Sequence, residues 1–522
     1  MKQFLLLLTI FIGIIPKTPA QKRSRPNILF AIADDVTYRY MSAYGCQWIE
    51  TPAFDRVAEA GILFNNAYTP NAKCAPSRSC ILTGRNSWQL EAAANHFPSF
   101  PAEFATFPEV LNANGYAIGF TGKGWAPGIA LDQDGSPRNL IGPAFNQQKT
   151  NPPTKEISNI DYYENFKSFY AQKTAEQPFF FWYGGNEPHR AYEFGTGESL
   201  GGKSISSITE VPAYWPDADS VRHDLLDFAL ELEYFDQHLG KMLDFLESKG
   251  ELENTLVVVT ADNGLPFPRL KGQAYEDAHH MPLAMMWPEG IASPGSSNND
   301  FVSFIDFAPT FLTVAAIEGS ENFMQTMTGK SLLPLILNPK ELPQNQDRTF
   351  VLIGKERHDI GRPQDQGYPI RGIFKGEYLY IKNYHPERWP AGNPETGYLN
   401  CDGGATKSYI LNQRRNEGIL HYWNLNFGKR AAEELYQIKE DPECLKNLAD
   451  DPHYQNVKHK LTNFLAQQLS LQNDPRQTNE PEYFMQFPYS GKHGPNFYER
   501  FTAGEEIKTP WINPTDIEPA GI

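Results

Sequence analysis

The sequence predicts an α/β protein with a mostly parallel sheet flanked by helices and a smaller C-terminal α+β subdomain. Short, continuous apolar segments alternate with helical stretches, as in sheets that are covered on both faces. Four of these segments end abruptly in charged or polar residues, and open parallel sheets bind ligands beyond the carboxyl ends of their strands. The 522 residues allow a large core and a second unit.

The expected elements follow from the spacing of apolar residues. The clearest helix covers 219–249, where apolar residues recur three and four positions apart and Gly250 ends the pattern. Shorter helices are expected over 52–60, 107–114 and 162–175, and 143–160 is expected to be a loop. The strands expected in the core are 28–33, 62–68, 116–120, 179–183, 256–260 and 281–287.

The pattern changes after about residue 345. Residues 350–354 and 373–384 alternate apolar and polar side chains, as antiparallel strands do, and a final helix is expected near 457–469. The last 52 residues are rich in Pro, Asn and charge. We therefore predict a large domain over 21–345, the α+β subdomain over 346–470, and an irregular tail over 471–522 that wraps on the surface.

Residues 1–20 predict a signal peptide. Lys2 precedes a mostly apolar run over 4–15, which is too short to span a bilayer, and small residues at 18–20 suit cleavage. No later stretch is long enough for a membrane span, so we expect an exported protein, periplasmic or secreted. The net charge of −16 argues against nucleic acid as a partner. An anionic substrate then requires a local cationic pocket.

The cysteines are few and odd in number. An odd count fits one thiol that is reserved for separate chemistry. Cys401 and Cys444 are candidates to pair within the C-terminal unit, although a sequence gives no connectivity. The five cysteines are Cys46, Cys74, Cys80, Cys401 and Cys444.

The most informative motif is C-A-P-S-R-S-C-I-L-T-G-R at 74–85. Pro76 suits the first turn of a helix, which places Cys74 at a helix N-terminus, where backbone N–H groups favour negative charge. Arg78 lies one turn further along the same face, and a guanidinium group suits sulfate or phosphate. A nucleophile and two anion-binding features therefore converge on one point.

Polar groups follow four of the expected strands. They are Asp34-Asp35, Lys123, His189 and Asp262-Asn263, and all four sets are expected to face one crevice with the Cys74 helix. The two acidic pairs supply only oxygen ligands. Oxygen ligands suit a hard cation such as Ca²⁺ or Mg²⁺ and do not suit zinc.

The C-x-P-S-R motif followed by L-T-G-R at 82–85 resembles that of type I sulfatases, and similar stretches extend to about residue 470. The resemblance implies an alkaline-phosphatase-like fold. It also implies that a formylglycine-generating or sulfatase-maturing enzyme converts Cys74 to formylglycine (3-oxoalanine), whose hydrate attacks sulfur. A Ca²⁺ ion beside residue 74 would be bound by the positions that match the family's ligands, Asp34, Asp35, Cys74, Asp262 and Asn263.

The same resemblance suggests roles for other residues. Arg78, Lys123 and Lys271 would contact the sulfate, the last within K-G-Q-A-Y-E, and His189 would face the leaving-group oxygen. Residues 187–190 and 262–268 look most like the heparan N-sulfatase branch. That branch also includes sequences similar to bacterial enzymes that act on algal polysaccharide sulfates.

Two departures from the family pattern affect these expectations. Trp125 replaces the usual histidine two residues after Lys123, so the catalytic base is open, and His96, His279 and His280 are candidates to substitute or to bind substrate. The segment 277–280 replaces the usual Gly-Gly-x-Arg. That change should alter the pocket that recognises the sugar.

The resemblance therefore predicts a sulfatase that acts on a carbohydrate, with O-sulfate favoured over N-sulfate. N-sulfoglucosamine sulfohydrolase (sulfamidase) is the alternative. A phosphomonoester or phosphonate hydrolase fits less well, because two-zinc phosphatases need more His and Asp ligands. A binding protein that retains an unmodified Cys74 is a further alternative.

Overall fold

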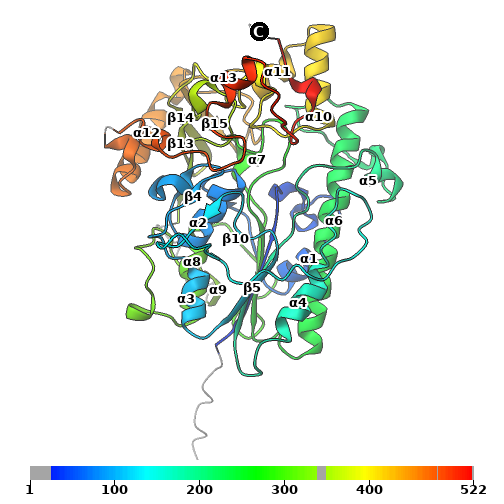
Figure 1. Cartoon of the computed structure of the whole chain (residues 1–522), viewed down its shortest axis with the longest axis vertical. Coiled ribbons are helices and arrows are strands. Elements are labelled where there is room, and N and C mark those ends of the chain that lie inside the picture. The colour runs from blue at the N-terminus through cyan, green and yellow to red at the C-terminus, as the bar shows by residue number, and fades with distance from the viewer. Residues whose placement is uncertain (1–24, 338–347, 479, 520–522) are drawn as a thin grey trace, which may run out of the picture.

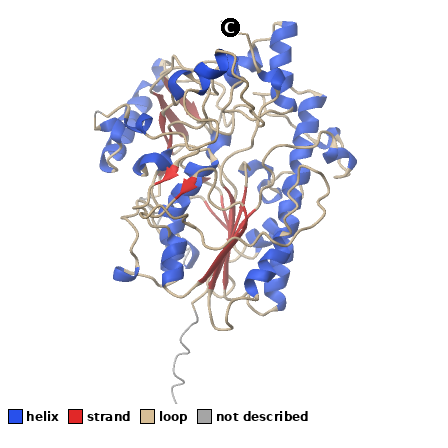
Figure 2. Ribbon diagram, viewed as in Figure 1, coloured by secondary structure: helices blue, strands red, loops and turns tan. Residues whose placement is uncertain are grey.

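The computed structural model describes residues 25–337, 348–478 and 480–519, so the expected leader at 1–20 lies outside the described residues. A central seven-stranded sheet carries helices on both faces, and a four-stranded antiparallel sheet formed by later residues lies at one end of it (Figures 1 and 2). The predicted class, a mostly parallel α/β sheet with a small C-terminal antiparallel sheet, is confirmed.

The central sheet has the strand order β10-β2-β9-β8-β1-β7-β5. Strands β8, β1, β7 and β5 are parallel, whereas β9 is antiparallel to both of its neighbours. Every residue of β1, β7 and β8 is buried, which explains their unbroken apolar sequences. The strands are β1 (Asn27–Ala33), β2 (Ile62–Phe64), β5 (Ala117–Gly122), β7 (Phe179–Gly184), β8 (Thr255–Ala261), β9 (Leu283–Met286) and β10 (Ser296–Asn298).

Helices cover both faces of this sheet (Figure 1). On one face, Phe30 of β1 packs against Phe307 and Phe311 of α8. On the other face, Phe181 of β7 packs against Phe166 of α4. The first face carries α2 (Cys74–Thr83), α3 (Phe107–Ala113) and α8 (Phe307–Val314), and the second carries α1 (Pro52–Glu59), α4 (Tyr162–Tyr170) and the 30-residue α6 (Asp219–Ser248).

The remaining elements are short. The helices among them are α5 (Thr196–Ser199), α7 (Glu276–His279), α9 (Leu333–Leu337), α10 (Ala405–Asn412), α11 (His421–Phe427) and α13 (Phe497–Thr502). Two pairs of short strands lie outside the main sheet, β3 (Ala67–Tyr68) with β11 (Val302–Ser303) and β4 (Ser99–Phe100) with β6 (Ile129–Ala130).

The C-terminal sheet is antiparallel throughout. The alternating stretch 373–384 spans a hairpin, because Gly376 adopts a φ of +59° and reverses the chain there. Helix α12 (Gln455–Leu471) packs on this sheet. The strands, in their order in the sheet, are β12 (Phe350–Lys355), β13 (Ile370–Lys375), β14 (Tyr378–Asn383) and β15 (Glu433–Gln437).

The segment after residue 471 does more than wrap the surface. Phe497 and Ile512 are buried in a cluster with Ile360 and Leu399. Asp516 forms an ion pair with Lys407 at 3.1 Å, and both side chains have 0% exposure. The C-terminal segment therefore packs against residues that lie between β12 and β15 in the chain.

All five cysteines are free thiols, so the candidate pairing of Cys401 with Cys444 is wrong. Cys401 packs in the main core, whereas Cys444 packs in a separate cluster with residues of the C-terminal sheet. Among the described helices, none combines the length and the apolar character that a membrane crossing needs.

Candidate active site

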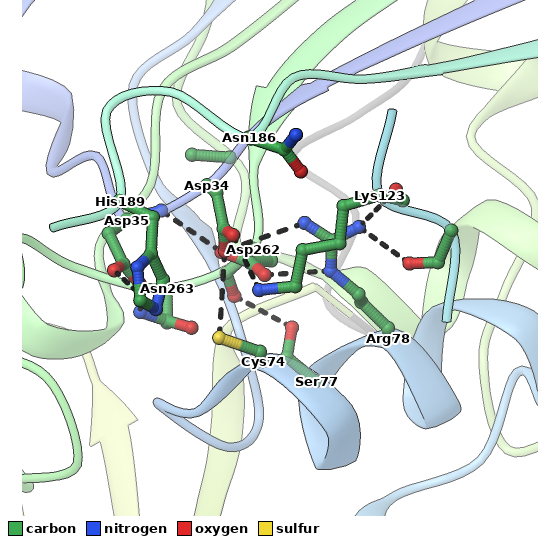
Figure 3. Close-up of polar contacts among 12 residues, drawn as sticks. Asp34, Asp35, Cys74, Ser77, Arg78, Lys123, Asn186, His189, Asp262 and Asn263 are labelled. Atoms are coloured by element: carbon green, nitrogen blue, oxygen red, sulfur yellow. Dashed lines mark hydrogen bonds and ion pairs between the residues drawn. The ribbon is translucent and has the colours of Figure 1, made fainter. Parts of the chain in front are cut away.

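Four strand ends and the start of α2 meet at one edge of the central sheet (Figure 3). The carboxyl ends of parallel strands share an edge, so side chains that follow them in the sequence become neighbours in space. Asp34 and Asp35 follow β1, Lys123 follows β5, His189 follows β7, and Asp262 and Asn263 follow β8. Residues separated by more than 200 positions in the chain thus surround Cys74.

Cys74 is the first residue of α2, with Lys73 as the N-cap. Its Sγ lies 3.5 Å from Oδ1 of Asp34, and the residue is 1% exposed. Burial, reinforced by the charge of Asp34, raises the pKa of the thiol well above its usual value. Since the thiolate is the nucleophilic form of cysteine, the site does not activate an unmodified Cys74.

Arg78 is fully buried and held in one orientation. Its Nε donates to Oδ2 of Asp262 at 2.8 Å, and its Nη1 donates to the backbone carbonyls of Lys123 at 2.8 Å and Gly124 at 2.7 Å. Its Nη2 lies 3.5 Å from Oδ1 of Asp34 and has no hydrogen-bond partner. One edge of the guanidinium group is therefore left to bind an anion.

Two lysines pair with the carboxylates of the first strand end. Lys123 Nζ lies 2.5 Å from Oδ2 of Asp34, and Lys271 Nζ lies 2.7 Å from Oδ2 of Asp35 and 3.1 Å from Oδ2 of Asp402. Burial opposes ionisation of Asp34, but Lys123 and Arg78 outweigh it and hold the pKa of this carboxyl well below its usual value. The site therefore holds fixed charges of both signs within hydrogen-bonding distance.

The acidic cluster fits a hard cation. One carboxylate oxygen from each of Asp34, Asp35 and Asp262 lies within 4.8 Å of the others. Asn263 donates from Nδ2 to Oδ1 of Asp35 at 2.5 Å, while its own buried Oδ1 has no hydrogen-bond partner. Burial raises the pKa of Asp35 and of Asp262 to about 6. An all-oxygen donor set with an unsatisfied amide oxygen suits Ca²⁺ or Mg²⁺.

His189 stands beside this cluster. Its Nε2 lies 3.9 Å from Oδ2 of Asp35, and its Nδ1 lies 2.5 Å from the carbonyl oxygen of Arg190. Since a carbonyl only accepts, Nδ1 carries a proton and Nε2 is the nitrogen that faces the carboxylates. Burial, followed by the charge of Lys271, lowers the pKa of His189 to about 4. Arg190 is itself fixed by two contacts of 2.7 Å with Asp224.

A cavity of about 280 Å³ opens onto this site. Four of the proposed catalytic residues border it, and further lining residues come from parts of the chain that the sequence did not single out. Asp359 and Asp402 follow no strand of the main sheet, and Trp511 lies in the C-terminal segment. The lining residues are Lys73, Cys74, His96, Phe97, Lys123, Ala126, Pro127, His189, Lys271, Asp359, Asp402 and Trp511.

Of the three candidate histidines, only His96 borders the cavity. His279 lies between backbone carbonyls, with Nδ1 2.8 Å from Thr69 O and Nε2 3.1 Å from Gln273 O. His280 contacts Glu276 at 2.7 Å and stacks on Tyr38 with 3.7 Å between ring centroids. Neither His279 nor His280 borders the cavity.

The structure shows what contacts the residues at the two departures from the family pattern make. Trp125 donates from Nε1 to Oγ of Ser79 at 2.8 Å and does not line the cavity. Asp277, in the segment 277–280, forms an ion pair with Arg39 at 2.9 Å and accepts a hydrogen bond from Tyr214 at 2.7 Å. That segment is buried and does not line the cavity.

Residues 26–317 match the family model described as Sulfatase. This match covers more than half of the chain, so the chain belongs to the sulfatase family and is a hydrolase of that family. The resemblance to sulfatases that the motif at 74–85 suggested is thereby confirmed.

Two curated relatives and one solved structure cover most of the chain. The N-sulphoglucosamine sulphohydrolase of Homo sapiens is 27% identical in an alignment of 493 positions that covers 87% of this chain and 92% of that protein. An ulvan-active sulfatase of Formosa agariphila is 25% identical over 88% of this chain and 77% of its own. A structure solved in complex with its substrate D-glucosamine-2-N,6-O-disulfate superposes with a TM-score of 0.63 at 20% identity, over 87% of this chain and 100% of that chain.

Proposed function

We propose that this sulfatase removes sulfate from a carbohydrate, with formylglycine at position 74 and a Ca²⁺ ion beside it. The observation that carries the proposal is the setting of Cys74. A thiol whose pKa is raised by burial is surrounded by three carboxylates, an arginine and two lysines. These surroundings suit an anionic substrate and a residue other than a free thiol.

The cation would be held by Asp34, Asp35, Asp262 and Asn263, next to residue 74. Asn263 supports this assignment because its buried Oδ1 lacks any partner among the described residues. As its hydrate, formylglycine would supply a hydroxyl nucleophile, and a bound Ca²⁺ ion would supply positive charge at the sulfate oxygens.

The side chains of this chain perform the remaining tasks. Arg78, through its free Nη2, and the ammonium groups of Lys123 and Lys271 bind the sulfate oxygens and stabilise negative charge that develops on them. His189 is fixed by the carbonyl of Arg190, which accepts from Nδ1, so the ring must first take up a second proton on Nε2 before it can donate that proton to the leaving oxygen. The negative charge of a bound sulfate opposes the factors that lower the pKa of this imidazole.

The substrate class is proposed from the relatives. One is named for N-sulphoglucosamine and another for ulvan, and both align over most of this chain. We propose an O-sulfate on a polysaccharide or oligosaccharide, and N-sulfoglucosamine is the second candidate because the human relative aligns over 92% of its length. Segment 277–280 does not bear on this choice, since it does not line the cavity.

Two measurements test the proposal. The peptide that contains residue 74, taken from protein co-expressed with a sulfatase-maturing enzyme, should be about 18 Da lighter than the cysteine form. Sulfate release should then be assayed on 4-nitrophenyl sulfate, N-acetylglucosamine 6-sulfate, D-glucosamine 2-N,6-O-disulfate and sulfated ulvan oligosaccharides, with 4-nitrophenyl phosphate beside them. Release of phosphate in preference to sulfate would reject a sulfatase function.

We also propose that the protein is exported, on the strength of the leader expected over 1–20. The measurement is N-terminal sequencing of protein recovered from the periplasm and from the medium of an expressing bacterium. A chain that begins at Met1 and stays in the cytoplasm contradicts export.

A further inference from the structure

Part of the cavity is built by residues that play no role in the proposed chemistry. We call His96, Phe97, Asp359 and Trp511 the ring end, and we call Cys74, Lys123, His189 and Lys271, together with Arg78, which does not itself border the cavity, the anion end. All four residues of the ring end border the cavity that Cys74 also borders. None of the four follows a strand of the central sheet.

Trp511 is anchored at both its side chain and its backbone. The indole Nε1 donates to the carbonyl of Leu399 at 3.0 Å, and the backbone N–H of Gly403 donates to the carbonyl of Trp511 at 2.8 Å. Five residues further on, the buried ion pair of Asp516 with Lys407 fastens the same segment to α10. The aromatic surface of Trp511 is therefore held in a fixed position at the cavity.

Phe97 is held by the same C-terminal segment. Ser490 donates to the carbonyl of Phe97 from its backbone N–H at 2.9 Å and from its hydroxyl at 2.8 Å. The ring of Tyr489 packs against that of Phe97 with 4.9 Å between centroids. Both aromatic residues of the ring end thus depend on residues beyond 471.

His96 supplies the ring end with a polar atom that lacks a hydrogen-bond partner. The residue is 6% exposed, its Nδ1 lies 2.8 Å from Oδ1 of Asp359, and Lys73 lies 2.7 Å from the other oxygen of that carboxylate. A carboxylate only accepts, so Nδ1 donates, and Nε2 is left as an acceptor. Nε2 is buried and has no partner within the described residues.

Such an acceptor is costly until a ligand or a water satisfies it, because a buried polar atom without a hydrogen bond loses its hydration. A sugar ring meets both demands of the ring end. Its C–H faces offer apolar surface for Trp511 and Phe97, and its hydroxyl or amide groups offer a donor for His96. The cavity volume of about 280 Å³ is at the lower end of small-molecule sites, which suits one ring with its sulfate.

We propose that the ring end is the subsite for the sugar ring that carries the sulfate, with Trp511 as its stacking surface and His96 as a hydrogen-bond acceptor for a ring substituent. The C-terminal segment is then a component of the substrate site. The proposal rests on the proposed function and specifies which residues recognise the sugar.

The test uses full-length, matured protein and separates KM from kcat for N-acetylglucosamine 6-sulfate, D-glucosamine 2-N,6-O-disulfate, ulvan oligosaccharides and 4-nitrophenyl sulfate. We expect Trp511→Ala and His96→Leu each to raise KM for the hydrolysed sugar sulfates at least tenfold, with kcat lowered less than threefold. Trp511→Phe, which keeps a ring, and His96→Gln, which keeps an acceptor, should recover part of that loss. Phe323→Ala, at a side chain that is 54% exposed, is the matched aromatic control.

The KM and kcat changes on sugar sulfates, compared with those on 4-nitrophenyl sulfate, separate sugar binding from proton transfer. Since 4-nitrophenyl sulfate has no ring hydroxyl, His96→Leu should affect its KM less than that of a sugar sulfate. An equal loss of kcat on both substrates would make His96 a proton-transfer group and overturn its assignment to the subsite. Unchanged KM values in Trp511→Ala would remove the C-terminal segment from the site.

Failure of the proposed sulfatase function can be distinguished from failure of the proposed subsite. A wild-type protein that releases sulfate from none of these compounds contradicts the proposed function itself. A wild-type protein that hydrolyses 4-nitrophenyl sulfate and no sugar sulfate retains the chemistry and overturns the sugar subsite.

Discussion

The two ends of the cavity are built on different principles. The anion end takes Lys123 and His189 from loops that follow parallel strands, Cys74 and Arg78 from α2, and Lys271 from the loop between β8 and α7, and ion pairs with Asp34 and Asp35 fix its three cations. The ring end takes its residues from loops and from the C-terminal segment, and it is fixed by packing from outside the main sheet. This difference implies that the residues proposed for the chemistry are positioned by the core of the fold, whereas the residues proposed to recognise the sugar can be substituted without disturbing that core.

The largest effect is expected from Cys74→Ala at the anion end. Sulfate release should fall on the order of 10⁴-fold or more, because removal of a nucleophile leaves only the binding contribution. The circular dichroism spectrum should stay unchanged, since the side chain makes one long contact of 3.5 Å with Asp34. Sulfate release at the wild-type rate by homogeneous Cys74→Ala protein contradicts the role of position 74.

Lys123→Met should come next. Removing one cation that faces the sulfate should lower kcat/KM by about 10²-fold to 10³-fold, or roughly 3 kcal/mol, as for deletion of one oxyanion-binding group. The control is Lys167→Met, since Lys167 pairs with Glu164 on the partly exposed surface of α4. Equal, small losses in steady-state assays of both variants would show that Lys123 does not bind the sulfate.

Lys407→Met tests whether the ring end can be destabilised without affecting the anion end. Breaking the buried pair with Asp516 should lower the free energy of unfolding by about 3 kcal/mol and expose the C-terminal segment to protease. KM for sugar sulfates should rise more than KM for 4-nitrophenyl sulfate. The double variant Lys407→Met/Asp516→Leu should recover part of the stability in thermal melts. An equal rise in KM for sugar sulfates and for 4-nitrophenyl sulfate would show that the two ends of the cavity do not act separately.

Calcium should stabilise the anion end. At a free Ca²⁺ concentration of 100 times Kd, binding to the folded state adds about 2.7 kcal/mol, so EDTA should lower Tm and Ca²⁺ should restore it. Asn263→Ala removes the unsatisfied Oδ1 and should reduce the Ca²⁺-dependent shift. The same Tm for the wild-type protein in EDTA and in Ca²⁺ would exclude a structural contribution from the ion.

The smallest effect concerns acid stability at the ring end. Burial lowers the pKa of His96 from its usual 6.5 to about 4, even though Asp359 favours the charged form and Lys73 opposes it. As the pH falls from 6.5 towards 4, the unfolded chain binds a proton that the folded state excludes. Stability is therefore lost across this window, by on the order of 2 kcal/mol at pH 5.

The matched variant for this effect is His96→Gln, which does not titrate. The difference in free energy of unfolding between pH 7 and pH 5 should be smaller in His96→Gln than in the wild-type protein by that amount. Chemical denaturation at the two pH values measures it. Identical pH dependence in the two proteins would mean that His96 is not the buried neutral group the structure shows.

Much of the fold follows from local pattern. Strands β1, β7 and β8 are short, fully apolar runs, and α6 repeats its apolar positions at helical spacing, so their type and approximate bounds could be predicted. The polar groups that follow these strands could be assigned to one edge, because a parallel sheet allows only that arrangement. The antiparallel direction of β9 could not be predicted, since the apolar residues of a strand do not show in which direction it runs relative to its neighbours.

The sequence by itself indicated the class of protein, through the motif at 74–85, and the edge of the sheet where Asp34, Lys123, His189 and Asp262 lie, because apolar strands end just before these residues. Lys271 could be assigned only through the family resemblance. Only the tertiary structure decided that His96 borders the cavity while His279 and His280 pack elsewhere. It alone brought Asp359, Asp402 and Trp511 to the cavity. The physical reason is that these contacts join residues hundreds of positions apart through the packing of irregular segments, which no local spacing records.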